Sequence, residues 1–122
     1  MRKSKHLNIL VIEDDSNIRF TTQTILESEG YSVSLAVHGR DGLETLRNME
    51  PPCLVLLDIN MPEMDGYEFL LEKNADPTIA SVPVVVVSAT AEVSRLGGVA
   101  EVVKKPFALE DLIATVGRFC GG

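Results

Sequence analysis

Four consecutive apolar residues, Leu54–Leu57, end at Asp58, and turn-forming residues follow at once. An apolar run without alternation is typical of a strand that helices cover on both faces, as in a parallel α/β sheet. Ligands of such sheets bind beyond the carboxyl ends of the strands. Asp58 is therefore predicted to lie where chemistry can take place, although capping of the next turn would also explain an aspartate there.

Four further stretches are predicted to be strands. Asn8–Ile12 and Val84–Val87 are short apolar runs like the first, so they are expected to lie in the middle of the sheet. Tyr31–Ala36 alternates apolar and polar residues and Val99–Lys104 carries charges, which predicts that these two are edge strands.

Apolar residues at helical spacing predict helices between the strands. The predicted segments run from about Ser16 to Gly30, from Arg40 to Met49, from about Tyr67 to Lys73, for a turn or two within Ala89–Gly98, and from about Leu109 to Phe119. Ile18, Ile25 and Leu26 are expected to form the buried face of the first, and Leu109, Leu112, Ile113, Val116 and Cys120 that of the last. The alternation predicts an α/β fold with a doubly wound five-stranded parallel sheet of order 2-1-3-4-5, helices on both faces, flavodoxin-like, and a shortened fourth helix.

Composition limits the functions that are open to the chain. Its 122 residues, 45% of them hydrophobic, are expected to form a single domain, 1–122. A formal net charge of -7 argues against direct binding to nucleic acid, whose phosphates attract basic surfaces. No apolar run reaches the roughly 18 to 20 residues that span a bilayer. The first residues lack the apolar region of a signal peptide, so a cytoplasmic protein without membrane contact is expected.

The two cysteines, Cys53 and Cys120, show no C-x-x-C spacing and have no histidines beside them. Neither a zinc site nor a disulfide framework is therefore indicated. Cys53 is interpreted as a small buried apolar residue. The two histidines, His6 and His38, are isolated and are expected at solvated loop positions.

Polar side chains follow four of the predicted strands. Because the carboxyl ends of parallel strands share one edge of the sheet, these side chains are predicted to form an ion-binding site. They are Glu13, Asp14, Asp58, Ser88 and Lys105. Crowded carboxylates stay ionised only beside a cation, and Mg²⁺ is the ion that suits carboxylate oxygens and a phosphate. Carboxylate, metal and lysine together favour in-line phosphoryl transfer to an aspartate.

The motifs ILVIEDD, LLDINMPEMDG, VVVVSA and VVKKPF occur in this order, each at a strand end. Over essentially the whole chain this pattern resembles the response-regulator receiver domain of bacterial two-component signalling. The resemblance implies that Asp58 accepts a phosphoryl group from a phosphohistidine on a histidine kinase or histidine phosphotransfer protein. The phosphorylated domain would then change conformation and control a downstream effector protein, so a signalling module rather than an enzyme is expected.

The same resemblance assigns roles to the other site residues. The Mg²⁺ ligands would be Asp14 directly, Glu13 through water, Asp58, and the backbone carbonyl of Asn60. Ser88 matches the switch hydroxyl that moves toward the phosphoryl group, and Lys105 the phosphoryl partner, followed by Pro106 in a peptide bond that is cis in the family. Asp15 is interpreted as a helix-entry acid that either caps the first helix or is solvated.

The chain departs from the family pattern at two places. Val102 occupies the position where the family commonly carries an aromatic switch residue, and the segment from Ser88 to Lys105 is shorter by roughly one helical turn. An abbreviated output surface is therefore expected. Lys104 is predicted to be solvated, because neighbouring residues of a strand point to opposite faces and only Lys105 directly precedes the proline.

Three other functions remain as alternatives. An aspartyl-phosphate phosphatase would require a second aspartate where the chain has Asn60. A flavodoxin-like or Rossmann-like cofactor binder would require a phosphate loop where the acids at 13–15 would repel an anion. A receiver-like adaptor that works without phosphorylation is the third.

Overall fold

The computed structural model describes residues 7–58, 65–88, 97–105 and 107–121. The strands are β1 (Asn8–Ile12), β2 (Ser32–Ala36), β3 (Leu54–Asp58), β4 (Val84–Ser88) and β5 (Val99–Lys104). The helices of these ranges are α1 (Ser16–Ser28), α2 (Gly39–Asn48), α3 (Asp65–Ala75) and α4 (Leu109–Cys120). The segment predicted as a short fourth helix, Asn60 and Pro106 lie outside the described residues.

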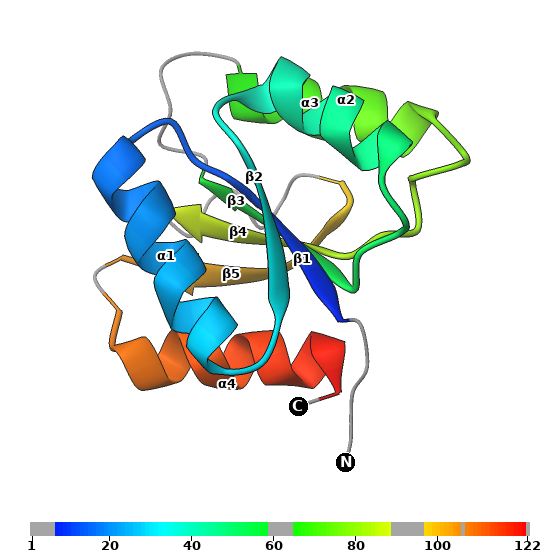
Figure 1. Cartoon of the computed structure of the whole chain (residues 1–122). Coiled ribbons are helices and arrows are strands. Elements are labelled where there is room, and N and C mark those ends of the chain that lie inside the picture. Colours follow the sequence, from blue (N-terminus) through cyan, green and yellow to red (C-terminus); the bar gives the residue numbers. More distant parts are fainter. Residues whose placement is uncertain (1–6, 59–64, 89–96, 106, 122) are drawn as a thin grey trace.

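All five strands run parallel in one sheet of order β2-β1-β3-β4-β5, which confirms the predicted topology (Figure 1). The strands β1, β3 and β4, each apolar except for one terminal residue, lie in the middle, and the alternating β2 and the charged β5 lie at the edges. The sequence pattern identifies the edges because an edge strand has one side open to water and tolerates polar residues there.

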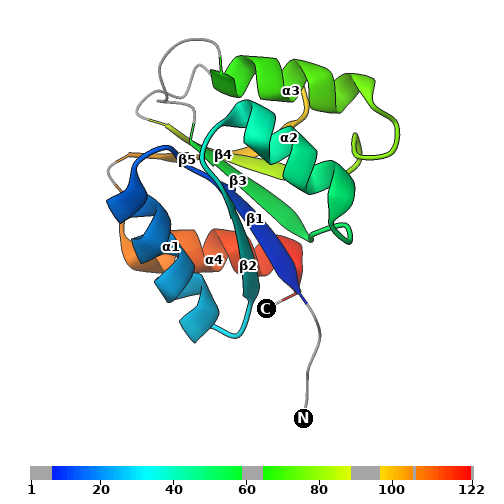
Figure 2. The same ribbon diagram turned by 45° about the horizontal axis from the view of Figure 1, so that its top comes forward.

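Two helical layers cover the sheet, with α2 and α3 on one face and α1 and α4 on the other (Figure 2). Successive residues of a strand point to opposite faces, so a strand between two layers has to be apolar throughout. The α2/α3 layer packs on Leu10, Ile12, Val55 and Leu57, and the α1/α4 layer packs on Ile9, Val11, Leu54 and Leu56. This is the physical reason for the apolar run that precedes Asp58.

The packing of α2 on β1 depends on the absence of a side chain at Gly42. A Cβ atom at this position would lie 2.4 Å from the Cδ1 of Ile12, which is fully buried. Such a distance is far below van der Waals contact, so any larger residue would force either the buried Ile12 side chain or the helix to shift. Gly42 therefore sets how closely the α2/α3 layer approaches the strand that precedes Glu13.

The helix ends lie within two residues of the predicted ones, and side chains close two of them. Asp15 caps α1 by accepting a hydrogen bond from the Ile18 N–H at 3.0 Å, which confirms the cap. His38 Nδ1 accepts from the Asp41 N–H at 3.2 Å and caps α2. The buried faces were predicted less well: Ile18 and Leu109, both in the first turn of their helix, are each 46% exposed.

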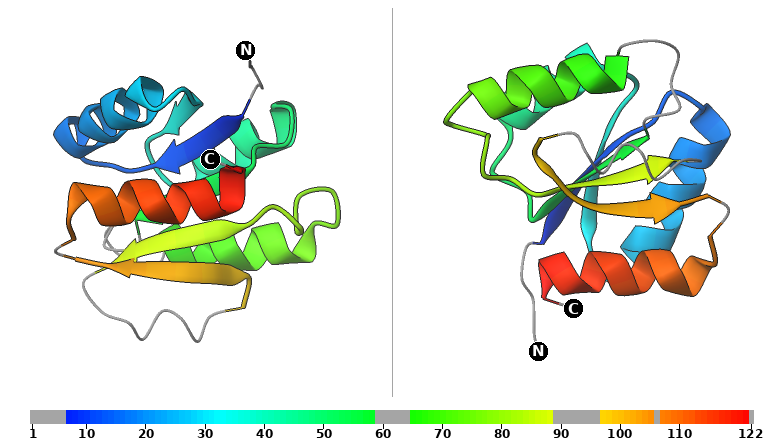
Figure 3. Two further views of the ribbon diagram at one scale, coloured as in Figure 1. Left: turned by 90° about the horizontal axis from the view of Figure 1, so that it is seen from below. Right: turned by 180° about the vertical axis from the view of Figure 1, so that it is seen from behind.

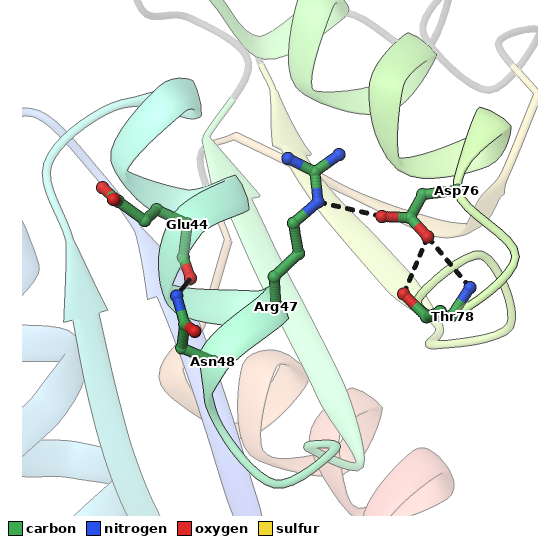
Figure 4. Close-up of polar contacts among 5 residues, drawn as sticks. All are labelled: Glu44, Arg47, Asn48, Asp76 and Thr78. Carbon is green, nitrogen blue, oxygen red and sulfur yellow. Dashed lines mark hydrogen bonds and ion pairs between the residues drawn. The ribbon is translucent and has the colours of Figure 1, made fainter.

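A side-chain network fixes the loop that leads from α3 to β4 (Figure 4). Arg47 of α2 donates from Nε to Asp76 at 2.9 Å, and the other oxygen of Asp76 accepts from the backbone N–H and the hydroxyl of Thr78. These hydrogen bonds, from Thr78 first and then from Arg47, lower the pKa of Asp76. Nearby, the fully buried Lys73 donates from Nζ to the Ala80 carbonyl oxygen at 2.7 Å, and burial lowers its pKa.

The interpretation of the cysteines was wrong. Cys53 and Cys120 form a disulfide, with their Cα atoms 5.4 Å apart, across a separation of 67 residues in the sequence. The spacing of two cysteines in the sequence cannot reveal this pairing, because only the fold places the end of α4 beside the residue before β3 (Figure 3). Cys53 is also half-buried rather than fully buried. In the part of the chain that the structure describes, no helix is long and apolar enough to cross a membrane.

Candidate functional site

Four of the predicted site residues gather at the carboxyl edge of the sheet. Glu13 directly follows β1, Asp58 ends β3, Ser88 ends β4 and Lys105 directly follows β5. Parallel pairing places these ends together, since Asp58 lies opposite Val87 and Ser88 lies opposite Lys104. The edge therefore brings together two acids, a hydroxyl and an amine that are distant in the sequence.

Three carboxylates form a cluster in which a metal ion could bind. Glu13, Asp14 and Asp58 each place one oxygen within 4.8 Å of the other two. Glu13 is 5% and Asp58 7% exposed, whereas Asp14 is open to solvent. Like charges at this distance repel strongly when they are shielded from water, so the cluster favours a proton or a cation among its members.

Glu13 has a raised pKa in this cluster, which favours its protonated form near neutral pH. Its pKa is raised to about 8, first because burial disfavours the charged carboxylate and then because of its hydrogen bond with Asp58. A hydrogen bond from the Asp15 N–H, at 3.1 Å, acts in the opposite direction. Arg19 of α1 donates to the Glu13 carbonyl oxygen at 2.8 Å and so fixes the backbone that carries the acids.

Lys105 supplies the positive charge of the site. Its Nζ lies 3.3 Å from Asp58 Oδ1, while its backbone N–H donates to the Ser88 carbonyl oxygen at 2.7 Å. The backbone hydrogen bond from Lys105 to Ser88 continues the pairing of β4 with β5, and it fixes the position from which the Lys105 side chain extends. Lys104 is exposed, as predicted.

Ser88 and Val102, on the neighbouring strands β4 and β5, occupy the two positions where the family pattern predicts switch residues. Ser88 is fully buried at the end of β4, and Val102 on β5 is half-buried against the α2/α3 core layer. An aliphatic side chain at position 102 fills space there but presents no ring. Asn60, the predicted carbonyl ligand, lies outside the described residues.

A pocket of about 610 Å³ opens beside the carboxylates, between α1 and α4. Its walls are mostly apolar. The lining residues are Val11, Ile12, Glu13, Ile18, Thr22, Leu56, Asp58, Val87, Lys105, Phe107 and Leu112. The half-exposed Ile18 thus borders an opening rather than the core.

Sequence reasoning missed Arg19 and this pocket. A guanidinium that binds a backbone carbonyl has no sequence signal, because any exposed arginine in a helix looks alike. The pocket has no sequence signal either, since its walls come from two helices and four strand ends that only the fold brings together. The apolar residues Ile18 and Phe107, which line the pocket and are partly exposed, could have indicated it, but the sequence analysis assigned Ile18 to the buried face of the first helix.

Comparisons with known proteins agree on one family. Residues 9–117 match the family model described as the response regulator receiver domain. The response regulator MprA of Mycolicibacterium vanbaalenii is 35% identical over 113 residues, which is 88% of this chain and 48% of that protein. The chain thus spans about half the length of the curated relatives it matches.

Solved structures show the same fold. The chemotaxis protein CheY4 of Vibrio cholerae superposes with a TM-score of 0.84 and 26% identity, over 94% of this chain and 99% of that one. The receiver domain of the sensor histidine kinase PA1611 of Pseudomonas aeruginosa gives a TM-score of 0.83 at 24% identity, over 97% and 100% of the two chains, and carries a magnesium ion in its active-site cleft.

Proposed function

The chain belongs to the response regulator receiver domain family, and from this premise we propose that Asp58 accepts a phosphoryl group from a phosphohistidine of a partner protein. The observation that carries the proposal is the setting of Asp58. Its carboxylate is nearly buried, lies 3.3 Å from the Lys105 ammonium and belongs to a cluster of three acids at a strand end beside an open pocket.

The proposed transfer is an in-line displacement at phosphorus. An Asp58 carboxylate oxygen forms a bond to phosphorus while the P–N bond to the partner's imidazole breaks, and its electron pair stays on the imidazole nitrogen. Lys105 donates from Nζ to a phosphoryl oxygen that carries charge during transfer. Ser88 donates its hydroxyl to another phosphoryl oxygen and is drawn toward it, which displaces the end of β4.

The donor set fits Mg²⁺. The cluster offers only carboxylate oxygens, which are the ligands that this hard ion prefers, and the exposed Asp14 leaves room for water. Glu13, Asp14, Asp58 and the Asn60 carbonyl would hold the ion. When bound, it would neutralise the carboxylates and the incoming phosphoryl oxygens. The magnesium in the PA1611 receiver domain supports this assignment.

The partners follow from this chemistry. The phosphodonor would be a histidine kinase or a histidine phosphotransfer protein, and the changed surface would control a downstream effector. Residues 1–122 would act as one receiver domain in the cytoplasm, either alone or within a longer regulator or hybrid kinase. The pocket between α1 and α4 leaves one side of Asp58 open for the donor.

Phosphorylation with a small donor tests the proposal. Acetyl phosphate and Mg²⁺ should add the mass of one phosphoryl group to the protein, and Asp58→Asn should lose this gain. Asp15→Asn is the matched control, because asparagine caps a helix as well as aspartate does and Asp15 lies outside the cluster. An unchanged mass with both acetyl phosphate and a phosphorylated histidine phosphotransfer protein would contradict the proposal and favour the phosphorylation-independent adaptor.

A further inference from the structure

The disulfide lies at the end of the sheet opposite the acidic cluster. Cys53 immediately precedes β3, the strand that ends at Asp58, and Cys120 is the last residue of α4. The Cys53 N–H donates to the Asn8 carbonyl oxygen at 2.9 Å, so this cysteine is fixed to the start of β1. The bond therefore joins the C-terminal turn of α4 to the start of the central strand β3.

The helix that the bond holds has its own packing. Leu112 and Val116 are buried against the sheet, and Arg118 forms an ion pair with Glu101 of β5. These contacts keep α4 on the sheet whether or not the two sulfurs are joined. The disulfide is thus an added restraint on the last turn rather than the origin of the fold.

Disulfides of cytoplasmic proteins are rare, and those that occur are mostly transient. We propose that Cys53 and Cys120 form a reversible, redox-controlled clamp, open as two thiols in a reducing cytoplasm and closed when a low-molecular-weight disulfide accumulates. Closure fastens the C-terminal turn of α4 to the start of β3. The clamp does not depend on phosphorylation of Asp58.

The two cysteines differ in accessibility, which sets the order of the exchange. Cys53 is half-buried and Cys120 is 3% exposed. The Cys53 thiolate attacks the small disulfide, forms a mixed disulfide and releases one small thiol. The Cys120 thiolate then attacks the Cys53 sulfur, and the second small thiol leaves. Two protein thiols are oxidised, one small disulfide is reduced to two thiols, and the two protons pass to the departing thiolates.

The opposite end of the clamped helix borders the site. Leu112, in the first turns of α4, lines the pocket beside Asp58, so a restraint on Cys120 acts on an element that reaches from the disulfide to that pocket. An effect of closure on phosphotransfer would rest on the proposed function. The clamp itself is measured without any phosphodonor, so the two proposals fail separately.

Equilibration in glutathione buffers tests the clamp. As the ratio of oxidised to reduced glutathione rises, the number of thiols that N-ethylmaleimide alkylates after an acid quench and unfolding should fall from two to none within the range of the buffers. The closed form should melt about 10 °C above the open form, because the bond closes a long loop in the unfolded chain. Amide exchange in 109–120 should be slower in the closed form, while α2, on the other face, serves as the unchanged reference.

Single substitutions complete the design. Cys53→Ser and Cys120→Ser should each abolish the difference in melting temperature between oxidising and reducing buffers. If either variant fails to fold, the thiol titration of the unaltered protein decides alone. A pair that stays oxidised in excess reduced glutathione, one that stays reduced in excess oxidised glutathione, or equal melting temperatures of the two forms would overturn the proposal.

Discussion

Lys105 and Asp58 make the contact at residue scale on which the proposed phosphotransfer depends. Their charged atoms lie 3.3 Å apart, and Asp58 is largely shielded from water. In such a setting one ammonium stabilises charge far better than it would in bulk solvent. Lys104, the adjacent residue, carries the same charge but is exposed. Lys105 and Lys104 therefore allow a comparison of a positive charge inside the site with one outside it.

We expect Lys105→Ala to lower the rate of phosphorylation by acetyl phosphate by about tenfold or more, because the transferred group loses its cationic partner. Lys104→Ala should leave that rate within about twofold, since its charge is exposed and screened by salt. Time courses of phosphoprotein formation measure both. Equal losses in the two variants would show that net charge, rather than the contact with Asp58, matters.

Glu13 makes stability depend on pH in a direction opposite to that of most acids. Its pKa is raised from 4.5 to about 8 by burial and by Asp58. Below 4.5 both the folded and the unfolded chain hold this proton, and between 4.5 and about 8 only the folded chain does. The metal-free protein should therefore lose stability as the pH rises through this interval.

Urea unfolding of the metal-free protein at several pH values between 4.5 and about 8 measures the effect. Glu13→Gln should flatten the dependence, because the amide keeps a hydrogen-bond donor toward Asp58 without a titrating proton. Asp76, whose pKa is lowered from 3.8, acts only at more acid pH and does not enter this window. A Glu13→Gln variant with the same slope as the unaltered protein would contradict the assignment.

At the scale of the element, α3 shows how packing overrides residue type. Lys73 is fully buried although its side chain carries an amine, as is the aromatic Phe69. Leu71, which lies between them in the sequence, is 70% exposed although it is apolar. Lys73 lies four positions after Phe69, so both are on the same, buried face of α3, whereas Leu71 points to solvent. Lys73 is tolerated because its amine reaches the Ala80 carbonyl oxygen.

Phe69→Ala should lower the free energy of unfolding by about 3 to 5 kcal/mol, because it leaves a cavity between α3 and the sheet. Leu71→Ala is the matched control on the same helix, and it should change the free energy by no more than about 0.5 kcal/mol. Chemical denaturation followed by circular dichroism measures both. Similar losses in the two variants would mean that α3 is held by its own helical stability rather than by Phe69.

The ends of the helices were predicted to within two residues, whereas the burial of residues in first helical turns was predicted less well. Ile18 and Leu109 share the spacing of their buried faces but are each 46% exposed, and Ile18 borders the pocket beside Asp58. Thr115 is the converse, a polar residue that is buried because it lies three positions after Leu112 on the face of α4 that packs on the sheet. Periodicity gives the direction in which a residue points, but not whether another layer lies there.

At the scale of the molecule, the central strands are buried on both faces, and the charged residues at their carboxyl ends lie together at one edge of the sheet. The cluster of Glu13, Asp14 and Asp58 is a site of repulsion in the metal-free protein, so a bound cation should stabilise the whole fold. Since two of these acids belong to the ends of the central strands, the effect should appear as a shift of the entire unfolding transition.

Mg²⁺ at about a hundredfold excess over its Kd should raise the free energy of unfolding by about 2.7 kcal/mol. Thermal melts with and without the ion measure this. Asp14→Asn should abolish the increase while leaving the metal-free melting temperature nearly unchanged, since Asp14 is exposed. Asp15→Asn should keep the increase. A Mg²⁺ effect of the same size in Asp14→Asn would place the ion elsewhere.

The sequence by itself determined the topology, because strands covered on both faces must be apolar and edge strands need not be. It also determined which residues follow the strands, and so placed Glu13, Asp58, Ser88 and Lys105 at one edge before any coordinates were known. Local patterns suffice here because the direction of a strand fixes where its last residue lies.

Only the tertiary structure decided what depends on residues that are distant in the sequence. It paired Cys53 with Cys120, buried Lys73 beside a carbonyl oxygen and opened a pocket between α1 and α4. It also brought Glu13 close enough to Asp58 to hold a proton. Each of these depends on distances of a few ångströms between separate elements, and such distances result from how whole layers pack rather than from any stretch of the chain.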